Sequence, residues 1–102
     1  MNGIAALSDP TRQRIVEMLS VGPLSSGDIA QRFEVSAPAI SQHLKTLRVA
    51  RLVRVRAAAQ RRIYELDPEG IAEISQWLER IKLFWSTKLD ALETQLKHEE
   101  QA

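Results

Sequence analysis

The sequence lacks cysteine, which excludes disulfides, cysteine-ligated zinc sites, thiolate nucleophiles and thiol redox sensing. It also lacks any apolar run near the ~20 residues that a membrane-spanning helix needs. Residues 1–7 lack the basic segment of a signal peptide, so a cytoplasmic protein is expected. No nucleophile–base–acid set is visible, which argues against an enzyme. With 102 residues, 44% hydrophobic and 26% charged, the chain suits one soluble globular domain over residues 1–102.

Acidic residues are missing from one long stretch, between Val35 and Tyr64. The net charge of +1 hides this asymmetry, because residues 31–62 carry eight basic residues and one acidic residue. That segment therefore carries +7, whereas residues 1–30 carry −1 and residues 63–102 carry −5. Charge alone leaves two interpretations open: a face that binds an anion, or a solvated basic surface.

Helix-start signals recur in the first third of the chain. Residues 8–10 place a capping aspartate before a proline and predict a helix over residues 10–20. Ser25, with Asp28 three residues later, resembles a capping box and predicts a helix of about two turns. A brief helix over residues 4–7 is expected to precede both.

A third capping signal, at residues 36–38, predicts a helix over about residues 37–49. Its core-facing side consists of three apolar residues at helical spacing, Ile40, Leu44 and Leu47. Only residues 34–36 connect it to the preceding short helix, which is typical of a helix-turn-helix unit.

After this helix the hydrophobic period changes to alternation, in residues 52–56 and again in residues 62–66. Two alternating runs with a short connection predict a β-hairpin, or wing, over about residues 52–66. The connection, residues 57–61, contains no Gly, Asn or Asp, so we expect a longer, mobile tip rather than a tight two-residue turn.

From Pro68 to about residue 97 the sequence predicts one long helix, followed by a polar tail that frays. Its main apolar stripe follows spacings of three and four residues and consists of Ile71, Ile74, Leu78, Ile81, Trp85, Leu89, Leu92 and Leu96. Trp77 and Phe84 form a second strip beside it. One strip is expected to pack on the protein's own core and the other on a second chain. An apolar effector pocket lined by the aromatic residues is the alternative.

The exposed side of the third helix carries residues suited to DNA. Gln42 can pair with both hydrogen-bonding positions of adenine, and Ser41 can donate or accept. Lys45 and Arg48 lie further along the helix, where they suit phosphates. The arginines of the hairpin can contact the DNA backbone or enter the minor groove. Helix pattern and charge block therefore both favour a nucleic-acid-binding face.

Several segments, in order and spacing, resemble the ArsR/SmtB-type winged helix-turn-helix repressors, in a cysteine-free subgroup. They are residues 6–12 with Ile15, 35–44, 52–56 and 61–68, and in the last helix Trp77-Leu78, Phe84-Trp85 and residues 89–92. The match covers about residues 4–96. It implies a mainly α fold with a small β-hairpin, in the order α-α-α-α-β-β-α. It also implies a homodimer, built from the first and last helices, that represses transcription at an inverted-repeat operator.

Residue pattern and resemblance together give two candidate sites. The DNA-binding residues are Ser36, Ala37, Pro38, Ser41, Gln42, His43, Lys45, Arg54, Arg56, Arg61 and Arg62. For His43, helix packing is an alternative to phosphate contact. The dimer-interface residues are Ile4, Leu7, Ile74, Leu78, Ile81, Trp85, Leu89 and Leu92.

The resemblance raises the question of metal sensing, and the residues answer it in the negative. The family's third-helix site needs cysteines, and its last-helix site needs paired histidines where this chain has Asp90 and the single His98. No metal and no cofactor are expected. An unknown small-molecule or protein effector stays open, as does autoregulation. The competing function is a dimeric winged-helix module that binds protein and no DNA.

The sequence departs from the family pattern at two positions. Arg51 stands where relatives usually carry glycine, so either a left-handed residue is strained there by roughly 1 kcal/mol or the helix ends differently. The wing tip also lacks the usual glycine.

Overall fold

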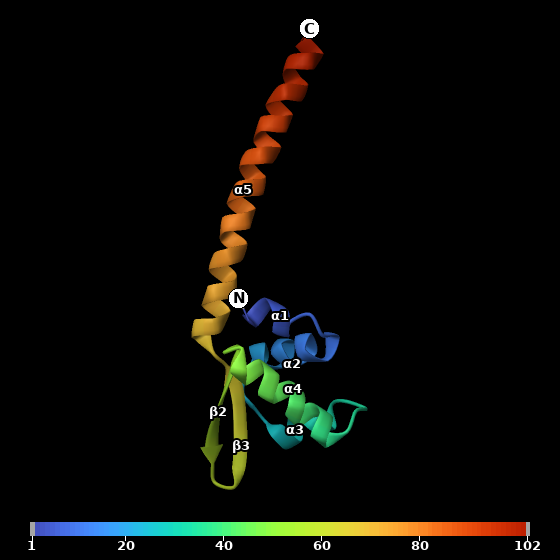
Figure 1. Ribbon diagram of the computed structural model, residues 1–102, viewed down its shortest axis with the longest axis vertical. Helices are drawn as coiled ribbons and strands as arrows, with labels where there is room; N and C mark the ends of the chain where they lie inside the picture. The colour runs from blue at the N-terminus through green and yellow to red at the C-terminus, as the bar shows by residue number, and fades with distance from the viewer. Residues whose placement is uncertain (1, 102) are drawn as a thin grey trace.

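A computed structural model describes residues 2–101 of the chain. Its elements follow the predicted order, with one added strand (Figure 1). They are α1 (Asn2–Ala6), α2 (Pro10–Val21), β1 (Leu24–Ser25), α3 (Ser26–Gln31), α4 (Ala37–Val49), β2 (Val53–Ala58), β3 (Arg61–Leu66) and α5 (Pro68–Gln101). The fold is a mainly helical winged helix-turn-helix with a small antiparallel sheet, as the sequence predicts.

The three predicted helix caps are present. The side chains of Asp9, Ser25 and Ser36 each accept a hydrogen bond from the backbone N–H three residues later, at 3.0, 3.1 and 3.3 Å. Each satisfies a donor that the first turn of its helix would otherwise leave free. Because α3 ends at Gln31, residues 32–36 connect it to α4, a longer connection than the expected residues 34–36, and the two helices still form the predicted unit.

The sheet has the strand order β1-β3-β2, where a hairpin alone was predicted. In the added strand, Leu24 pairs with Tyr64 and Ser25 pairs with Ile63. A strand of two residues is too short to show the alternation that marks strands in a sequence. It places the hairpin beside the start of α3, which fixes the wing relative to the helices.

The expectation of a longer wing tip is wrong. Ala58 pairs with Arg61, so only Ala59 and Gln60 connect the strands. Ala59 has a φ of 57° and supplies the left-handed residue that such a turn usually takes from glycine. The cost for an L-residue is about 1–2 kcal/mol, which the additional strand pairing offsets.

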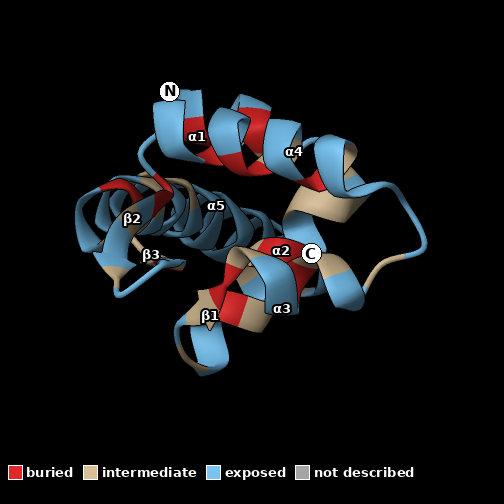
Figure 2. Ribbon diagram, turned by 90° about the horizontal axis from the view of Figure 1, so that it is seen from below, coloured by how far each residue is buried: buried red, intermediate tan, exposed pale blue. Residues whose placement is uncertain are grey.

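The core lies between α1, α2, α3, α4 and the sheet (Figure 2). The buried hydrophobic residues are Ala6, Ile15, Leu19, Ile29, Ile40, Leu44, Leu47, Leu52, Val53 and Tyr64. The apolar face predicted for α4 is therefore the face that packs inward.

Between α4 and β2, Arg51 adopts a left-handed conformation with a φ of 64°. Of the two expected alternatives, a strained left-handed residue or a different helix end, the structure has the left-handed residue. Its carbonyl packs against Gly70 in the first turn of α5, where a Cβ would lie 1.8 Å from the carbonyl oxygen. The backbone N–H of Asp67 donates to the carbonyl of Leu52 at 2.9 Å, and Arg51 forms an exposed ion pair with Glu69 at 3.4 Å. The end of α4 and the start of α5 are thus joined directly.

Helix α5 leaves the body after its first turns (Figure 1). Ile71 and Ile74 pack against the core, but the large apolar residues beyond Ile81 are exposed. The expectation that one whole strip packs on the protein's own core is therefore wrong. The helix extends to Gln101, beyond the end expected near residue 97. At about 1.5 Å per residue it is ~51 Å long, and it gives the molecule extents of 72 × 27 × 22 Å. Within residues 2–101, no helix combines the length and apolarity needed to cross a membrane.

Candidate nucleic-acid interface

Helix α4 presents an exposed polar face opposite its buried apolar one. Ile40, Leu44 and Leu47 are at most 1% exposed, which fixes the rotation of the helix about its axis. Ser41 and Gln42 are consequently held on the outside, near the N-terminal end of the helix. The N-terminal residues of such a helix are the ones that reach base edges when the helix enters a major groove.

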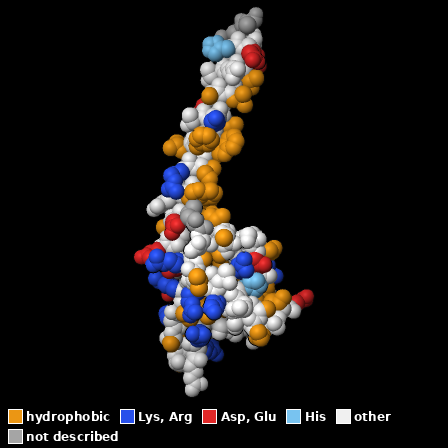
Figure 3. Space-filling model, viewed as in Figure 1, with side chains coloured by type: hydrophobic (Ala, Val, Ile, Leu, Met, Phe, Trp, Pro, Cys, Tyr) orange, Lys and Arg blue, Asp and Glu red, His pale blue; other side chains and the backbone are white. Residues whose placement is uncertain are grey.

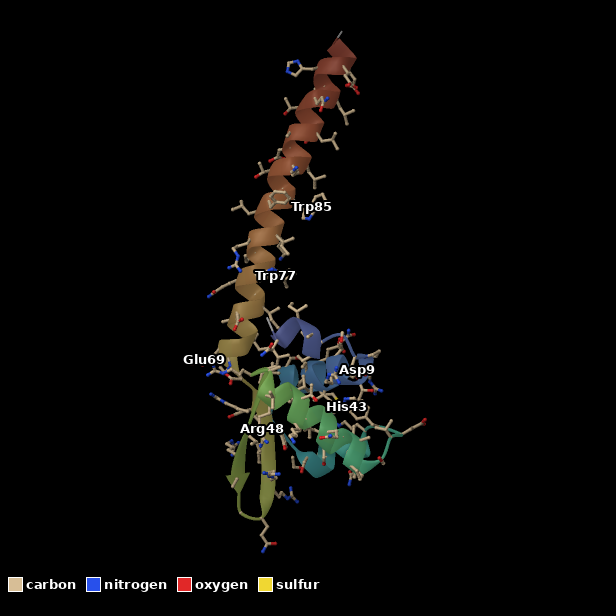
Figure 4. All side chains as sticks on the ribbon, in the orientation of Figure 1. Asp9, His43, Arg48, Glu69, Trp77 and Trp85 are labelled. Carbon is tan, nitrogen blue, oxygen red and sulfur yellow. The ribbon has the colours of Figure 1, made fainter. Side chains whose placement is uncertain are left out.

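A groove of about 660 Å³ lies between α4 and the wing. Its lining from α4 is Ala37, Pro38, Ser41, Gln42, Lys45 and Arg48, and its lining from β3 is Arg62 and Tyr64. It brings together six of the eleven predicted DNA-binding residues. Arg48, which the sequence suggested only as a phosphate contact, belongs to it (Figure 4).

The wing arginines lie on two faces of the hairpin. In the antiparallel register Ala57 pairs with Arg62 and Val55 with Tyr64, so Arg62 shares the inner face that turns toward α4. The same alternation places Arg54, Arg56 and Arg61 on the outer face. The sequence shows the alternation, but only the register shows which arginine faces the groove.

The outer-face arginines differ from Arg62 in their partners. Glu65 accepts a hydrogen bond from Arg54 at 3.0 Å and lies 4.0 Å from Arg56. Both arginine side chains remain 55% exposed, so the pairs are weak in water and can exchange for phosphate. Arg61 lines a second groove, of about 410 Å³ between the wing tip and α3, which Arg62 borders as well.

No cation of the central groove has an acidic partner. Among residues 2–101, Lys45, Arg48 and Arg62 take part in no ion pair. Basic side chains gather over this part of the body, whereas acidic ones are found mainly on α5 and its base (Figure 3). The groove therefore offers uncompensated positive charge to an anion.

His43 lies on the side of α4 that faces α2, away from the groove (Figure 4). Its Nδ1 is 3.2 Å from Nη1 of Arg12 and 3.9 Å from the carboxylate of Asp9. Arg12 also donates from Nε to the carbonyl of Ala6 at 2.6 Å, which ties α1 and α2 to α4. These contacts correspond to the helix-packing alternative, and the side chain is only 23% exposed.

The same cluster lowers the pKa of Asp9 below its ordinary value. The main cause is the hydrogen bond from the backbone N–H of Arg12, which favours the charged carboxylate. Burial, the next-largest effect, acts in the opposite direction and raises the pKa, while the neighbouring His43 ring and Arg12 guanidinium lower it further. Asp9 is therefore a charged cap that links the start of α2 to the recognition helix.

Ser36 caps α4 by accepting a hydrogen bond with its hydroxyl oxygen, which leaves the hydroxyl hydrogen free to donate to a ligand. The predicted dimer residues fall into two groups. Leu7 and Ile74 pack partly on the core, whereas Ile4, Leu78, Trp85, Leu89 and Leu92 are exposed and Ile81 is half-buried. No cluster of three or more metal-ligating side chains occurs among the residues that the structure describes.

Known proteins resemble the chain in sequence. Residues 9–55, which span α2 to the middle of the wing, match the family described as "Bacterial regulatory protein, arsR family". The regulator Rv2034 of Mycobacterium tuberculosis is 51% identical over 84 residues, covering 82% of this chain and 76% of its own. The transcriptional repressor SdpR of Bacillus subtilis is 35% identical over 76% of this chain and 86% of its own.

Relatives also include the transcriptional activator HlyU of Vibrio cholerae, 35% identical over 76% of this chain and 72% of its own. Among solved structures, an ArsR-like transcriptional regulator from Rhodococcus superposes with a TM-score of 0.75 at 31% identity, covering 91% of this chain and 88% of that one. The sequence similarity, the fold and the basic groove on α4 all indicate the same family. The chain belongs to the ArsR family of DNA-binding, winged helix-turn-helix transcriptional regulators.

Proposed function

We propose that the protein is a repressor that acts as a homodimer on an inverted-repeat operator, with residues 1–102 as its single DNA-binding domain. The observation that carries the proposal is the groove between α4 and the wing, where exposed base-reading side chains lie beside three unpaired cations. Double-stranded DNA matches this surface, because the base edges in its major groove are flanked by phosphates.

Within this proposal the groove residues have separate roles. Ser41 and Gln42 read base edges, with Ala37 and Pro38 packing beside them. The backbone contacts come from Ser36, Lys45, Arg54, Arg56, Arg61 and Arg62, and we add Arg48 to them. His43 supports α4 from behind and reaches a phosphate only at the edge of the contact.

A second copy is proposed because α5 exposes large apolar side chains along most of its length. Trp85 is 57% exposed and Leu89 is 58% exposed, and an exposed apolar stripe of this size favours association. Two copies related by a two-fold axis match an operator with two-fold symmetry.

The first test is fluorescence anisotropy with DNA from the region upstream of the protein's own gene and with a scrambled control, at two salt concentrations. We expect at least a hundredfold preference for the native DNA, and binding that weakens steeply with salt because several phosphates are neutralised. No binding at either salt concentration would refute the proposal. Since an activator occurs among the relatives, in vitro transcription from the bound promoter decides between repression and activation.

The two kinds of contact are separated by matched variants. Gln42→Ala should weaken operator binding by about tenfold or more, the discrimination of one base pair contact, with little effect on scrambled DNA. Arg56→Ala should weaken both alike and reduce the salt slope by about one. Gln95→Ala, on the exposed part of α5, is the control for Gln42→Ala and should change neither. Identical behaviour of the first two variants would show that the roles are wrongly assigned.

A further inference from the structure

Arg12 contacts two other helices with one side chain. From the start of α2, its Nε donates to the carbonyl of Ala6 at the end of α1 at 2.6 Å. Its Nη1 lies 3.2 Å from Nδ1 of His43 on α4. Within residues 2–101, this is the only side-chain hydrogen bond that joins α4 to another helix or strand. Arg12 is half-buried, and a hydrogen bond in such surroundings is stronger than one on an open surface.

The contact with Arg12 fixes the protonation state of the His43 ring. A guanidinium has N–H donors and no acceptor, so Nδ1 of His43 must accept the hydrogen bond and carry no proton. The neutral ring then has its single N–H on the other nitrogen, Nε2. A protonated ring donates from both nitrogens, so it cannot keep this hydrogen bond. It would instead attract the carboxylate of Asp9, which is 3.9 Å from Nδ1.

The charged groups that face the ring come from α2 and its cap. They are the guanidinium of Arg12 and the carboxylate of Asp9 (Figure 4). Helix α1, whose sequence is NGIAA, offers the carbonyl of Ala6 to Arg12 but has no titratable side chain. On α4 itself the nearest charged residue in sequence is Lys45, which lines the groove. The ring of His43 therefore has one cation and one anion as neighbours, and its own charge decides which of them it contacts.

The hydrogen bond from Arg12 adds a fixed point to the placement of α4. Ile40 and Leu44 bury one face of the helix, but apolar contacts are non-directional and permit small shifts along the surface they cover. A hydrogen bond has a preferred length and angle, so this one ties α4 to α1 and α2 at a single position. That position is His43, which directly follows Gln42 in the chain.

We propose that Arg12 is a positioning residue for base reading, which acts by holding the neutral His43 ring and with it the turn of α4 that carries Ser41 and Gln42. Arg12 is not among the residues that line the groove between α4 and the wing, so it acts on the bases only through α4. The inference rests on the proposed function, because it assigns a further residue to the same DNA-reading face.

A pH dependence of specific binding follows from this role. Histidine is the side chain that takes up a proton between about pH 5 and pH 8. Protonation of His43 breaks the contact with Arg12, so the preference for the operator should weaken as the pH falls through this range. The added positive charge attracts phosphate, so binding to scrambled DNA should not weaken with it.

The state of the ring is tested first in the free protein. Long-range proton–nitrogen NMR spectra distinguish the two neutral forms of a histidine ring. His98, in the last turn of α5, is the only other histidine, and the His43→Asn variant assigns the signals. We expect His43 to carry its proton on Nε2 at about pH 8. A proton on Nδ1 would overturn the inference, whether or not the protein binds DNA.

The positioning role is tested by the ratio of operator affinity to scrambled-DNA affinity at about pH 8. Arg12→Lys keeps the charge, but an ammonium cannot hold Ala6 and His43 with two fixed donors as the guanidinium does. We expect the ratio to fall at least about fivefold, the lower end of the discrimination of one base contact. An unchanged ratio would overturn the inference. So would an equal fall in both affinities, which is what a role in stability alone would produce through the unfolded fraction.

Arg14→Lys is the matched control, because Arg14 lies in the same helix and makes no contact with α4. Its guanidinium carbon is 4.6 Å from the centroid of the Phe33 ring, a position that a lysine ammonium can also take. This variant should keep the wild-type ratio. Combined with Gln42→Ala, Arg12→Lys should change the ratio much less than it does alone, because the base contact that it positions is already gone. Full additivity of the two changes would overturn the inference.

A matched pair of substitutions at His43 tests the acceptor and the pH dependence. Asparagine places an oxygen near the position of Nδ1, and leucine has a similar shape without an acceptor. His43→Asn should therefore keep most of the ratio at about pH 8, whereas His43→Leu should lose it as Arg12→Lys does. From about pH 8 to about pH 5.5 the ratio should fall in the wild type and stay constant in His43→Asn. A parallel fall in both proteins would show that another group titrates, and would overturn the role of the ring.

Failure of this inference is distinct from failure of the proposed function. A wild type without preference for the upstream DNA would refute the repressor, and the positioning role with it. A preference that survives in Arg12→Lys would refute the positioning role alone and leave the repressor in place. Urea unfolding of each variant, followed by circular dichroism, shows that every protein is folded at the temperature of the assay.

Discussion

Gly70 offers the sharpest test of the packing, because helix propensity and the structure predict opposite effects of Gly70→Ala. Gly70 lies within α5, and alanine in a helix is ordinarily about 1 kcal/mol more favourable than glycine. The Cβ of alanine would however lie 1.8 Å from the carbonyl oxygen of Arg51 and 2.6 Å from its carbonyl carbon. Both are backbone atoms, so no side chain can rotate away.

Relief of this overlap requires a backbone shift of more than an ångström at the joint between α4 and α5. Such overpacking costs about 1–3 kcal/mol and occasionally more. Arg51 is already in a left-handed conformation, which leaves it little freedom to adapt. Set against the gain in helix propensity of about 1 kcal/mol, the middle of this range leaves a net loss of roughly 1 kcal/mol. For a chain of this size that lowers the Tm by about 4–8 °C.

The assay is urea unfolding of the wild type and the variant, followed by circular dichroism at two protein concentrations. Gly27→Ala in α3 is the matched control, because the nearest atom to its Cβ is Oγ of Ser25 at 4.0 Å. That control should be neutral or slightly stabilising. If Gly70→Ala were as stable as the wild type, the close approach of Arg51 to α5 would not exist in solution.

Two further predictions concern charges around α4 and the wing. Glu65→Gln removes the carboxylate that Arg54 and Arg56 share. In anisotropy titrations, binding to any DNA should therefore tighten several-fold at low salt, and the affinity should fall more steeply with salt concentration. Unchanged affinity would show that these arginines do not contact phosphate. Asp9→Asn keeps a capping side chain but removes its charge. Because the folded-state pKa of Asp9 is lowered, its charge stabilises the fold above about pH 4, the unfolded value, and this contribution is lost as the pH falls through the folded value. The wild type should therefore be more stable than Asp9→Asn at pH 7, and the unfolding free energies of the two proteins should converge below pH 4. A difference in unfolding free energy that does not change with pH would contradict the contacts of Asp9.

Much of the fold follows from local signals that the sequence displays openly. The caps at Asp9, Ser25 and Ser36 and the face formed by Ile40 and Leu44 locate the helices, because both signals act within one or two turns. The predictions that failed depend on distant partners. A two-residue strand exists only because β3 is beside it, and the tight wing tip depends on strand pairing that outweighs the cost at Ala59.

The candidate site divides in the same way. The residues of α4 could be predicted because their exposure follows from the helical period. The contrast between Arg62 and the outer-face arginines could not, since it depends on the register of β2 with β3 and on where Glu65 falls. Likewise, nothing local in the sequence indicates that His43 meets Arg12, thirty-one positions away.

The joint at Gly70 has a consequence for how a dimer would measure DNA. Because the end of α4 packs against the first turn of α5, each α4 helix is held directly against its own long helix. In the proposed homodimer, pairing of the two α5 helices would then fix the distance between the two α4 helices. Successive major grooves on one side of DNA are about 34 Å apart, and a slip of one helical turn between the two long helices would change the separation of the bodies by about 5.4 Å. The register of a stripe far from the DNA would thus set which operator spacing the protein accepts.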